Sequence, residues 1–277
     1  MTLEVNRIYC MDAKEGSKLL PNDFVDLTVT SPPYDDLRTY KGYSFDFEPI
    51  AQELYRVTKP GGVVVWVVGD ATVKGSETGT SFRQALYFRD ECGFNLHDTM
   101  IYAKNGAAYP AGKNSKRYSQ VFEYMFVFSM GEPVSANLIK DKPNKWAGSS
   151  TFGNSSNRQT DGTLKLSGKR TVGDYGYRDN IWKLNTGRGY GTTDDIANKH
   201  PATFPEQLAH DHIVSWSNPG DLVLDPMCGS GTTCKMAMAT GRNYIGIDIS
   251  KEYCEIARKR VAEHTAQASI FDLGVSE

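Results

Sequence analysis

The segment from Asp225 to Thr233 has the residue types of a loop that binds a nucleoside cofactor. It reads Asp-Pro-Met-Cys-Gly-Ser-Gly-Thr-Thr and lies between a predicted strand and a predicted helix. Gly229 and Gly231 allow a tight turn and a close approach of the backbone to a ligand. Asp248 ends the next predicted strand, where a carboxylate can accept hydrogen bonds from both hydroxyls of a ribose. Together these residues predict an adenosine-binding crevice.

Other nucleotide-binding loops differ from this one at defined positions. A dinucleotide fingerprint has Gly or Ala three positions after the second loop glycine, where this chain has Cys234. A phosphate-binding P-loop contains Gly-Lys followed by Ser or Thr, and the chain has no such sequence. Phosphoryl transfer is therefore disfavoured.

A second motif, Ser31-Pro32-Pro33-Tyr34, follows a predicted strand, and open α/β sheets bind ligands at the carboxyl ends of their strands. The prolines stiffen the turn, so the Ser31 hydroxyl and the Pro32 carbonyl are held as two fixed acceptors. The amino group of a nucleobase is a poor nucleophile because its lone pair is delocalised into the ring. Two acceptors that bind its N–H groups favour a pyramidal nitrogen, while the Tyr34 ring can stack on the base. Taken alone, such a turn is more often a surface turn than a catalytic one.

Strands and helices alternate around these two motifs. Strands are predicted at 5–10, 24–30, 63–68, 96–104, 121–128, 221–224 and 244–247, and helices at 47–58, 81–92, from the Thr203–Glu206 capping box to Trp216, and at 232–240 and 252–263. The apolar strand 63–68 follows a helix that Lys59-Pro60-Gly61-Gly62 ends, which indicates a parallel sheet buried on both faces. The last dozen residues are expected to fray. The pattern predicts the α/β class.

The stretch from about Gly131 to Asn198 is richer in polar, basic and aromatic residues than its surroundings. Between Lys104 and Asn198 the chain has 14 Lys and Arg against 8 Asp and Glu, whereas the remainder has 17 against 25. A basic segment with interspersed aromatic rings is typical of a surface that faces phosphates and stacks bases. A solvated loop region is the alternative interpretation. We interpret the stretch as an inserted module.

Composition excludes several other classes of protein. Of the 277 residues 39% are hydrophobic and 23% charged, and the longest uninterrupted apolar run is Val63–Val68, so no membrane-spanning segment is expected. The amino end lacks the apolar core of a signal peptide, and a cytoplasmic protein is expected. The five cysteines include no Cys-x-x-Cys pair and are predicted to be buried or half-buried free thiols; the histidines form no metal motif. No Cys follows a Pro, which excludes the cysteine-dependent methylation of carbon 5 of cytosine.

Together the two motifs resemble those of the amino-methylating DNA methyltransferases, which transfer a methyl group from S-adenosylmethionine to N4 of cytosine or N6 of adenine. The Ser31-Pro32-Pro33-Tyr34 turn is similar to their catalytic motif in its N4-cytosine form, since the adenine form usually begins with Asp. The loop after Asp225 is similar to their cofactor loop, with Met227 where many members have Phe. The resemblance covers most of the chain. It implies cofactor contacts from Asp12, Ala13, His200, Pro201, Thr203, Asp225, Pro226, Met227, Gly229, Ser230, Gly231, Thr232, Thr233, Asp248 and Ile249.

The motif order, catalytic turn first and cofactor loop last with a basic insert between them, is that of the family's β group. It implies a circularly permuted Rossmann-like methyltransferase sheet with an inserted target-recognition region. Strand 5–10 should then lie beside the strand that ends at Asp248, which brings Asp12 near the cofactor adenine. The expected parts are a catalytic half at 1–130, the recognition insert at 131–198 and a cofactor-binding half at 199–277. DNA contacts are expected from Arg38, Arg158, Lys169, Arg170, Arg178 and Arg188.

The resemblance implies direct in-line transfer to a base flipped out of duplex DNA, without a metal ion or a covalent intermediate. N6 of adenine, or an amine of RNA or of a small molecule, is the alternative acceptor. The enzyme is expected to act either beside a cognate restriction endonuclease or as an orphan modification enzyme. A monomer and a homodimer are both compatible with the sequence.

Overall fold

The structure is a computed structural model that describes residues 2–33, 45–106, 116–150, 156–166, 170–185, 191–192, 194, 196–197 and 205–273. Two compact units divide the chain. The larger unit is formed by Met1–Asn137 and Asn180–Glu277, and the smaller unit by Leu138–Asp179.

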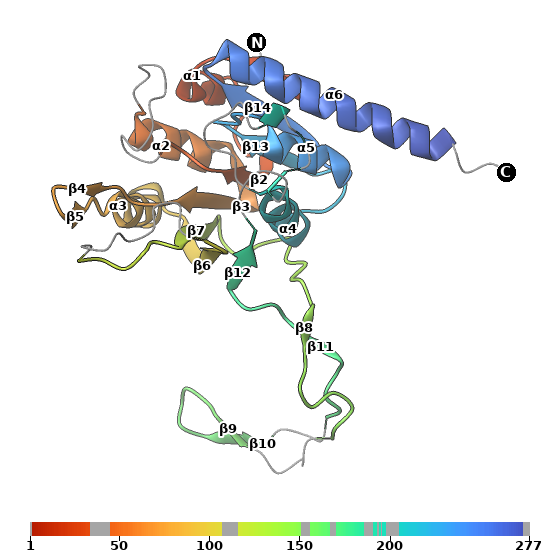
Figure 1. The fold of residues 1–277 in the computed structure, drawn as a ribbon. Helices are drawn as coiled ribbons and strands as arrows, with labels where there is room; N and C mark the ends of the chain where they lie inside the picture. Colours follow the sequence, from red (N-terminus) through yellow and green to blue (C-terminus); the bar gives the residue numbers. More distant parts are fainter. Residues whose placement is uncertain are drawn as a thin grey trace. The chain divides into compact units, whose positions relative to one another are not determined.

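The larger unit is built on a sheet that has eight strands among the described residues, in the order β1-β14-β13-β2-β3-β7-β6-β12 (Figure 1). These strands are β1 (Arg7–Cys10), β2 (Val25–Thr30), β3 (Thr58–Val68), β6 (Asn95–Lys104), β7 (Phe122–Ser129), β12 (Ile181–Leu184), β13 (Leu222–Asp225) and β14 (Asn243–Asp248). Neighbours from β1 to β3 are parallel, β7 is antiparallel to β3 and β6, and β12 is parallel to β6. A short hairpin of β4 (Thr72–Val73) and β5 (Ser76–Glu77) follows β3.

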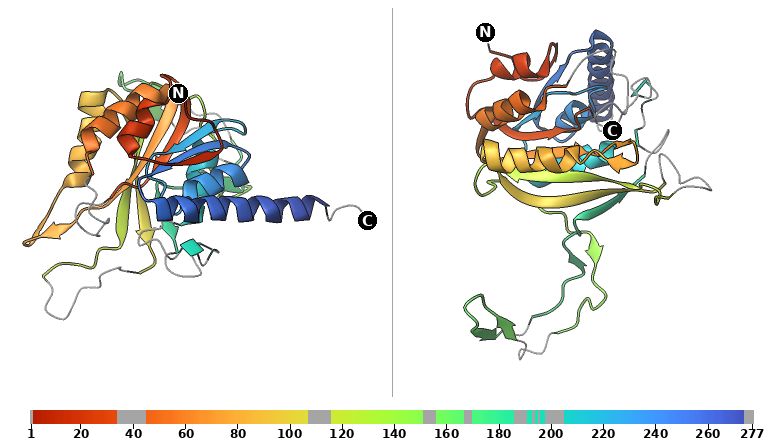
Figure 2. Two further views of the ribbon diagram at one scale, coloured as in Figure 1. Left: turned by 90° about the horizontal axis from the view of Figure 1, so that it is seen from above. Right: turned by 90° about the vertical axis from the view of Figure 1, so that its left-hand side faces the viewer.

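Helices cover both faces of this sheet, as Figure 2 shows. The helices are α1 (Ala13–Lys18), α2 (Phe47–Val57), α3 (Thr80–Tyr87), the π-helical turn η1 (Phe88–Cys92), α4 (Glu206–Trp216), α5 (Thr232–Ala239) and α6 (Lys251–Leu273). Strand β3 divides the core by its alternation: Val65 belongs to the apolar cluster that includes residues of α4, α5 and α6, and Trp66 to the cluster that includes residues of α2 and η1. The predicted burial of this strand on both faces is confirmed.

The amino-terminal strand β1 lies beside β14, with Cys10 opposite Asp248 in a parallel register. The first strand of the chain thus completes the sheet next to the last one, and the predicted permuted Rossmann-like methyltransferase sheet is confirmed. Asp12 and Asp248 consequently lie at the same edge of the sheet, because the backbone N–H of Met11 donates to the Asp248 carbonyl at 3.0 Å.

The predicted helix 81–92 is confirmed as α3 followed directly by η1, with Gly93 as the C-cap residue. Three other expectations about individual elements were wrong. Strand β3 begins at Thr58, so the Pro-Gly-Gly segment lies within the strand and does not precede it. Helix α6 continues to Leu273, so residues 266–273 are helical and not frayed as expected, while residues 274–277 lie outside the described residues. Helix α4 begins without the predicted capping box, because Pro205 is its N-cap residue. The Glu206 carboxylate instead accepts hydrogen bonds from the side chains of Lys235 and Arg260.

The thiol prediction holds for four of the five cysteines. All five are free, Cys228, Cys234 and Cys254 are buried, and Cys92 is half-buried. Cys10 is exposed because β1 is the edge strand of the sheet. No helix in the described ranges is long and apolar enough to cross a membrane.

The smaller unit contains two antiparallel strand pairs. Strand β8 (Lys142–Pro143) pairs with β11 (Tyr175–Gly176), and β9 (Ser156–Arg158) pairs with β10 (Leu164–Leu166). This unit is shorter than the expected insert 131–198, because the chain after it returns to the larger unit and forms β12 beside β6. Within the larger unit β12 contributes the buried ring of Trp182, which stacks on His212 of α4.

Candidate active site

The candidate site lies where the connections of the sheet change direction. After β13 the chain passes through α5 to β14 on one side, whereas after β2 it passes through α2 to β3 on the other side. Such a switch point leaves a crevice outside the carboxyl ends of the two central strands, and ligands of α/β sheets bind there. The Ser31 turn follows β2, and the loop that begins at Asp225 follows β13. The two motifs singled out in the sequence therefore meet at one edge.

A buried hydrogen bond joins the ends of these two strands. The Thr30 hydroxyl donates to Asp225 Oδ1 at 2.7 Å, and the backbone N–H of Met227 donates to the same oxygen at 3.2 Å. The hydroxyl of Thr233 donates to the Val29 carbonyl at 3.0 Å. Residues about 200 positions apart are thus held together, and the end of β2, which leads into the Ser31 turn, is attached directly to the loop that follows β13.

Burial controls the ionisation of Asp225. Its side chain is 2% exposed, and desolvation raises its pKa to about 6, although hydrogen bonds from Thr30 and Thr233 act in the opposite direction. A carboxyl group in this position accepts hydrogen bonds within the protein. These hydrogen bonds hold the two loops together, and the predicted cofactor contact of Asp225 stays a prediction.

The cofactor loop is also attached to β14. The backbone N–H of Gly229 donates to Asp248 Oδ2 at 2.9 Å, the N–H of Ser250 donates to Oδ1 at 2.8 Å, and the N–H of Cys228 donates to the Ile247 carbonyl at 2.8 Å. Burial raises the pKa of Asp248, while these backbone hydrogen bonds counteract the rise. Each carboxylate oxygen retains a second acceptor position, so the orientation of Asp248 is fixed and the group fits two ribose hydroxyls.

Two glycines make the turns of this loop. Gly229 and Gly231 have φ of +49° and +77°, which side-chain-bearing residues adopt rarely. A Cβ atom on Gly231 would lie 2.7 Å from the Cβ of Ala257 in α6, so the turn also permits close packing of two helices. The Ser230, Thr232 and Thr233 side chains are buried and donate to or accept from protein groups.

The other expected cofactor residues lie around this edge. Asp12 is the N-cap of α1, and its Oδ1 accepts from the backbone N–H groups of Lys14 and Glu15. Ala13 begins α1, Ile249 is exposed just after β14, and Pro226 is buried. The expected contacts His200, Pro201 and Thr203 lie outside the described residues.

The catalytic turn is described through Pro33. Ser31 and Pro33 are half-buried, Pro32 is buried, and all three follow β2 without regular structure. Tyr34 lies outside the described residues.

The expected DNA-binding residues of the smaller unit differ in their surroundings. Arg158 is exposed in β9 and Arg170 is exposed beside Thr171. Arg178 donates to Asp141 from Nε at 3.1 Å, an ion pair that also lowers the Asp141 pKa. The lysines near it are engaged as well: Lys142 pairs with Asp179 at 2.7 Å, and Lys140 lies 4.7 Å from the ring centroid of Tyr177. Arg38, Lys169 and Arg188 lie outside the described residues.

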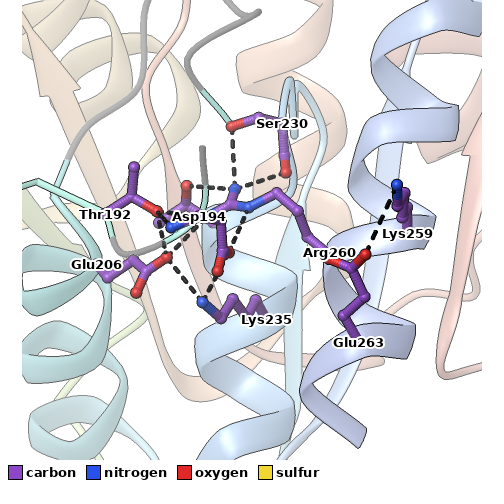
Figure 3. A network of polar contacts seen from close by, with 9 residues as sticks. Thr192, Asp194, Glu206, Ser230, Lys235, Lys259, Arg260 and Glu263 are labelled. Carbon is purple, nitrogen blue, oxygen red and sulfur yellow. Dashed lines mark hydrogen bonds and ion pairs between the residues drawn. The ribbon is translucent and has the colours of Figure 1, made fainter. Parts of the chain in front are cut away.

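Sequence reasoning missed a partly buried group of charges beneath the loop that follows Asp225. Asp194, Glu206, Lys235 and Arg260 form ion pairs there, and we refer to these four residues as the charge cluster (Figure 3). No local signal could have shown it, because Lys235 and Arg260 occur in helical patterns where a basic residue usually faces solvent. No group of three or more potential metal ligands occurs in the parts of the chain that the structure describes.

Comparison with known proteins gives the class to which this site belongs. Residues 25–259 match the N6/N4 methylase family, described as DNA methylase. The chain is 58% identical over 241 residues to the orphan methyltransferase M.BamHII of Bacillus amyloliquefaciens, covering 87% of this chain and 89% of that protein. Among solved structures, the PvuII DNA methyltransferase (cytosine-N4-specific) has the same fold, with a TM-score of 0.67, 20% identity and coverage of 96% and 92%. The M1.HpyAVI–SAM complex matches with a TM-score of 0.59, 25% identity and coverage of 92% and 98%.

The chain therefore belongs to the N6/N4 DNA methylase family. It is a DNA methyltransferase of the type that modifies amino groups, as the two motifs imply.

Proposed function

We propose that this enzyme transfers a methyl group from S-adenosylmethionine to N4 of cytosine in duplex DNA. The observation that carries the proposal is the attachment of the Ser31 turn to the cofactor loop through Thr30 and Asp225 at the switch point of the sheet. Ser31 in place of an acidic residue favours cytosine over adenine. The cytosine-N4 specificity in the name of the PvuII enzyme, whose fold this chain shares, agrees with that choice.

In this proposal the protein orients the amine. The Ser31 hydroxyl and the Pro32 carbonyl accept from the two N–H bonds of the cytosine amino group, so its lone pair becomes available for attack. The base is flipped out of the duplex, and the ring of Tyr34 stacks on it. Holding acceptor and donor in line converts a bimolecular encounter into a reaction within one complex.

Asp248 accepts from the ribose hydroxyls of the cofactor, and the backbone around Gly229 and Gly231 lies against its other end, together with Pro226 and Met227. Asp12 accepts from the adenine amino group through the carboxylate oxygen that does not cap α1. S-adenosylmethionine supplies an electrophilic methyl group on a sulfonium. The bond from nitrogen to the methyl carbon forms as the sulfur–carbon bond breaks, S-adenosylhomocysteine leaves, and the surplus proton of the methylated amine passes to water, so no metal ion is required.

We assign DNA recognition to the smaller unit. Its 8 basic residues against 4 acidic ones attract phosphates, and Arg158 in β9 is the described arginine best presented for a base or phosphate contact. A two-stranded ribbon such as β9–β10 has the width that the major groove admits. The resemblance to an orphan methyltransferase favours a modification enzyme that acts in the cytoplasm without a cognate endonuclease.

The test is to incubate the purified protein with S-adenosylmethionine and mixed-sequence duplex DNA, digest the DNA to nucleosides and identify modified bases by mass spectrometry. We expect N4-methylcytosine, and sequencing of the modified sites then gives the recognition sequence. Detection of N6-methyladenine would refute cytosine as the target base but would agree with methyl transfer to an amino group of DNA. The absence of any modified base, with methylation of an RNA or small-molecule amine instead, would refute DNA as the acceptor.

A further inference from the structure

The charge cluster lies directly beneath the loop proposed to bind the cofactor. Two of its residues are basic and two acidic, so its formal charge is zero. The Arg260 and Lys235 side chains are buried, at 0% and 6% exposed, whereas those of Asp194 and Glu206 are half-buried, at 23% and 16% exposed. Figure 3 shows Arg260 reaching from α6 to the loop at Ser230 and toward Thr192, Asp194 and Glu206.

One edge of the Arg260 guanidinium holds the second half of the cofactor loop. Its Nη1 donates to the Ser230 carbonyl at 2.7 Å and lies 3.1 Å from both the Ser230 and the Thr232 hydroxyl oxygens. These two residues flank Gly231, whose positive φ makes the turn. The backbone of the loop is therefore fixed from below by Arg260 and at Gly229 by Asp248.

The other nitrogens of Arg260 hold a different part of the chain. Nε donates to Asp194 Oδ2 at 2.9 Å, and Nη2 donates to Glu206 Oε1 at 2.7 Å and to the Thr192 hydroxyl at 3.2 Å. Lys235 of α5 donates to the same two carboxylate oxygens at 2.8 and 2.9 Å. Thr192 and Asp194 belong to the segment that follows β12, and Glu206 begins α4. Arg260 thus connects the loop to the chain that returns from the smaller unit.

Stability alone is a poor explanation for this arrangement. Desolvation of four charges offsets much of the attraction between them, and packed apolar side chains of similar volume are often equally stabilising. Burial raises the pKa of Asp194, yet hydrogen bonds from Lys235 and Arg260 lower it overall, so the carboxylate stays ionised. What a planar guanidinium provides that an apolar group cannot is a fixed set of directions for its five N–H donors.

We propose that Arg260 is a positioning residue for the cofactor: it sets the geometry of the backbone at Ser230 and Thr232, and the charge cluster makes cofactor affinity depend on Asp194 and Thr192. The inference rests on the proposed function, because it assumes that this loop binds S-adenosylmethionine. It assigns a role to residues that contact neither the cofactor nor the base.

The primary test is Arg260→Lys, which keeps the charge and removes the fork of donors. We expect the dissociation constant for S-adenosylmethionine, measured by calorimetry on the full chain, to rise by about tenfold or more. The kcat at saturating cofactor should stay within about threefold of wild type, because the Ser31 turn is held separately through Thr30 and Asp225. The KM for DNA should not change.

Arg258→Lys is the matched control. Arg258 lies on the same helix and also donates to a backbone carbonyl, that of Ile8 at 2.6 Å, but it does not contact the loop. Arg258 is exposed, so this variant should reproduce the loss of an arginine-to-backbone hydrogen bond on the same helix without raising the dissociation constant for S-adenosylmethionine. An equal rise in both variants would show a general effect of stability and would overturn the proposal.

Asp194→Asn tests the part of the chain that follows β12. It also replaces Arg260→Lys as the test variant if Arg260→Lys does not fold. It is isosteric and lies outside the loop, and we expect it to weaken cofactor binding by several-fold. Wild-type affinity in Arg260→Lys, or in Asp194→Asn when only that variant folds, would overturn the positioning role while the proposed function stands. Failure of the wild-type protein to bind S-adenosylmethionine would instead overturn the proposed function.

Discussion

At the scale of single residues, the Ser31 hydroxyl tests the proposed chemistry most directly. Ser31→Ala removes one of the two acceptors for the target amine and leaves the extended backbone before Pro32 intact. We expect turnover to fall by about 10²-fold or more, as for the loss of one polar group that orients a transition state. The affinity for S-adenosylmethionine should be unchanged. Methyl incorporation into DNA and calorimetric titration measure the two quantities, and unchanged turnover would remove Ser31 from the mechanism.

Asp225 gives a second prediction at this scale, because burial raises its pKa from 3.8 to about 6. Between these values the unfolded chain has lost the proton that the folded protein still binds, so this group makes the folded state less stable as pH rises from about 4 to 6. The full effect is about 3 kcal/mol and persists above pH 6. Asp225→Asn should lack this contribution.

The measurement is urea unfolding of the wild type and of Asp225→Asn between pH 4.5 and 7.5. The free energy of unfolding of the variant minus that of the wild type should increase as pH rises from 4.5 to about 6, because only the wild type loses this stability. Parallel pH profiles would show that Asp225 titrates in the folded protein as it does in the unfolded chain.

At the scale of elements, the contact between α5 and α6 depends on Gly231. An alanine there combines a positive φ of +77° with a Cβ only 2.7 Å from the Cβ of Ala257 and 3.0 Å from its Cα. Gly75, in the β4–β5 hairpin, has φ of +81° and no atom within 4 Å of the same added Cβ. Gly75→Ala should therefore cost about 1 kcal/mol of stability from backbone strain alone.

Gly231→Ala should cost about 1–3 kcal/mol more than Gly75→Ala, because helix α6 must also shift. Urea unfolding of both variants separates the two contributions. Equal losses would mean that α5 and α6 separate without cost and that the close packing at Gly231 is unimportant.

At the scale of the whole molecule, we expect the larger unit to bind the cofactor and the smaller unit to contribute to DNA binding. Replacing Leu138–Asp179 by a Gly/Ser linker removes no described strand of the large sheet and no residue of its two apolar clusters. The remaining protein should bind S-adenosylmethionine with wild-type affinity. DNA affinity should fall, and its dependence on salt should become shallower, because fewer phosphates are neutralised.

DNA binding is measured for both proteins between 50 and 200 mM salt, with cofactor titration as the control for folding. An unchanged slope of log affinity against log salt would place the phosphate contacts in the larger unit. Loss of cofactor binding would show that the larger unit depends on the smaller one.

The local features of this protein could be predicted from the sequence because each is set by neighbours along the chain. A glycine turn between a strand and a helix, an acid at the end of the next strand, and alternation in 63–68 all have short-range signatures. The order of the motifs, with their resemblance to a known family, extended these features to a permuted sheet and to a candidate site.

Tertiary structure alone decided which distant groups meet. Periodicity shows that a side chain is buried but not what it contacts. The sequence therefore did not indicate the hydrogen bond between Thr30 and Asp225, which are 195 positions apart. Arg260 and Lys235 have the spacing of ordinary helical surface residues, and only the packing of α5 and α6 against the chain near Asp194 buries them. In the same way β12 was assigned by composition to the insert, although its pairing with β6 makes it part of the sheet. Burial of a charged side chain depends on a partner elsewhere in the chain, and the neighbouring sequence does not show which residue that partner is.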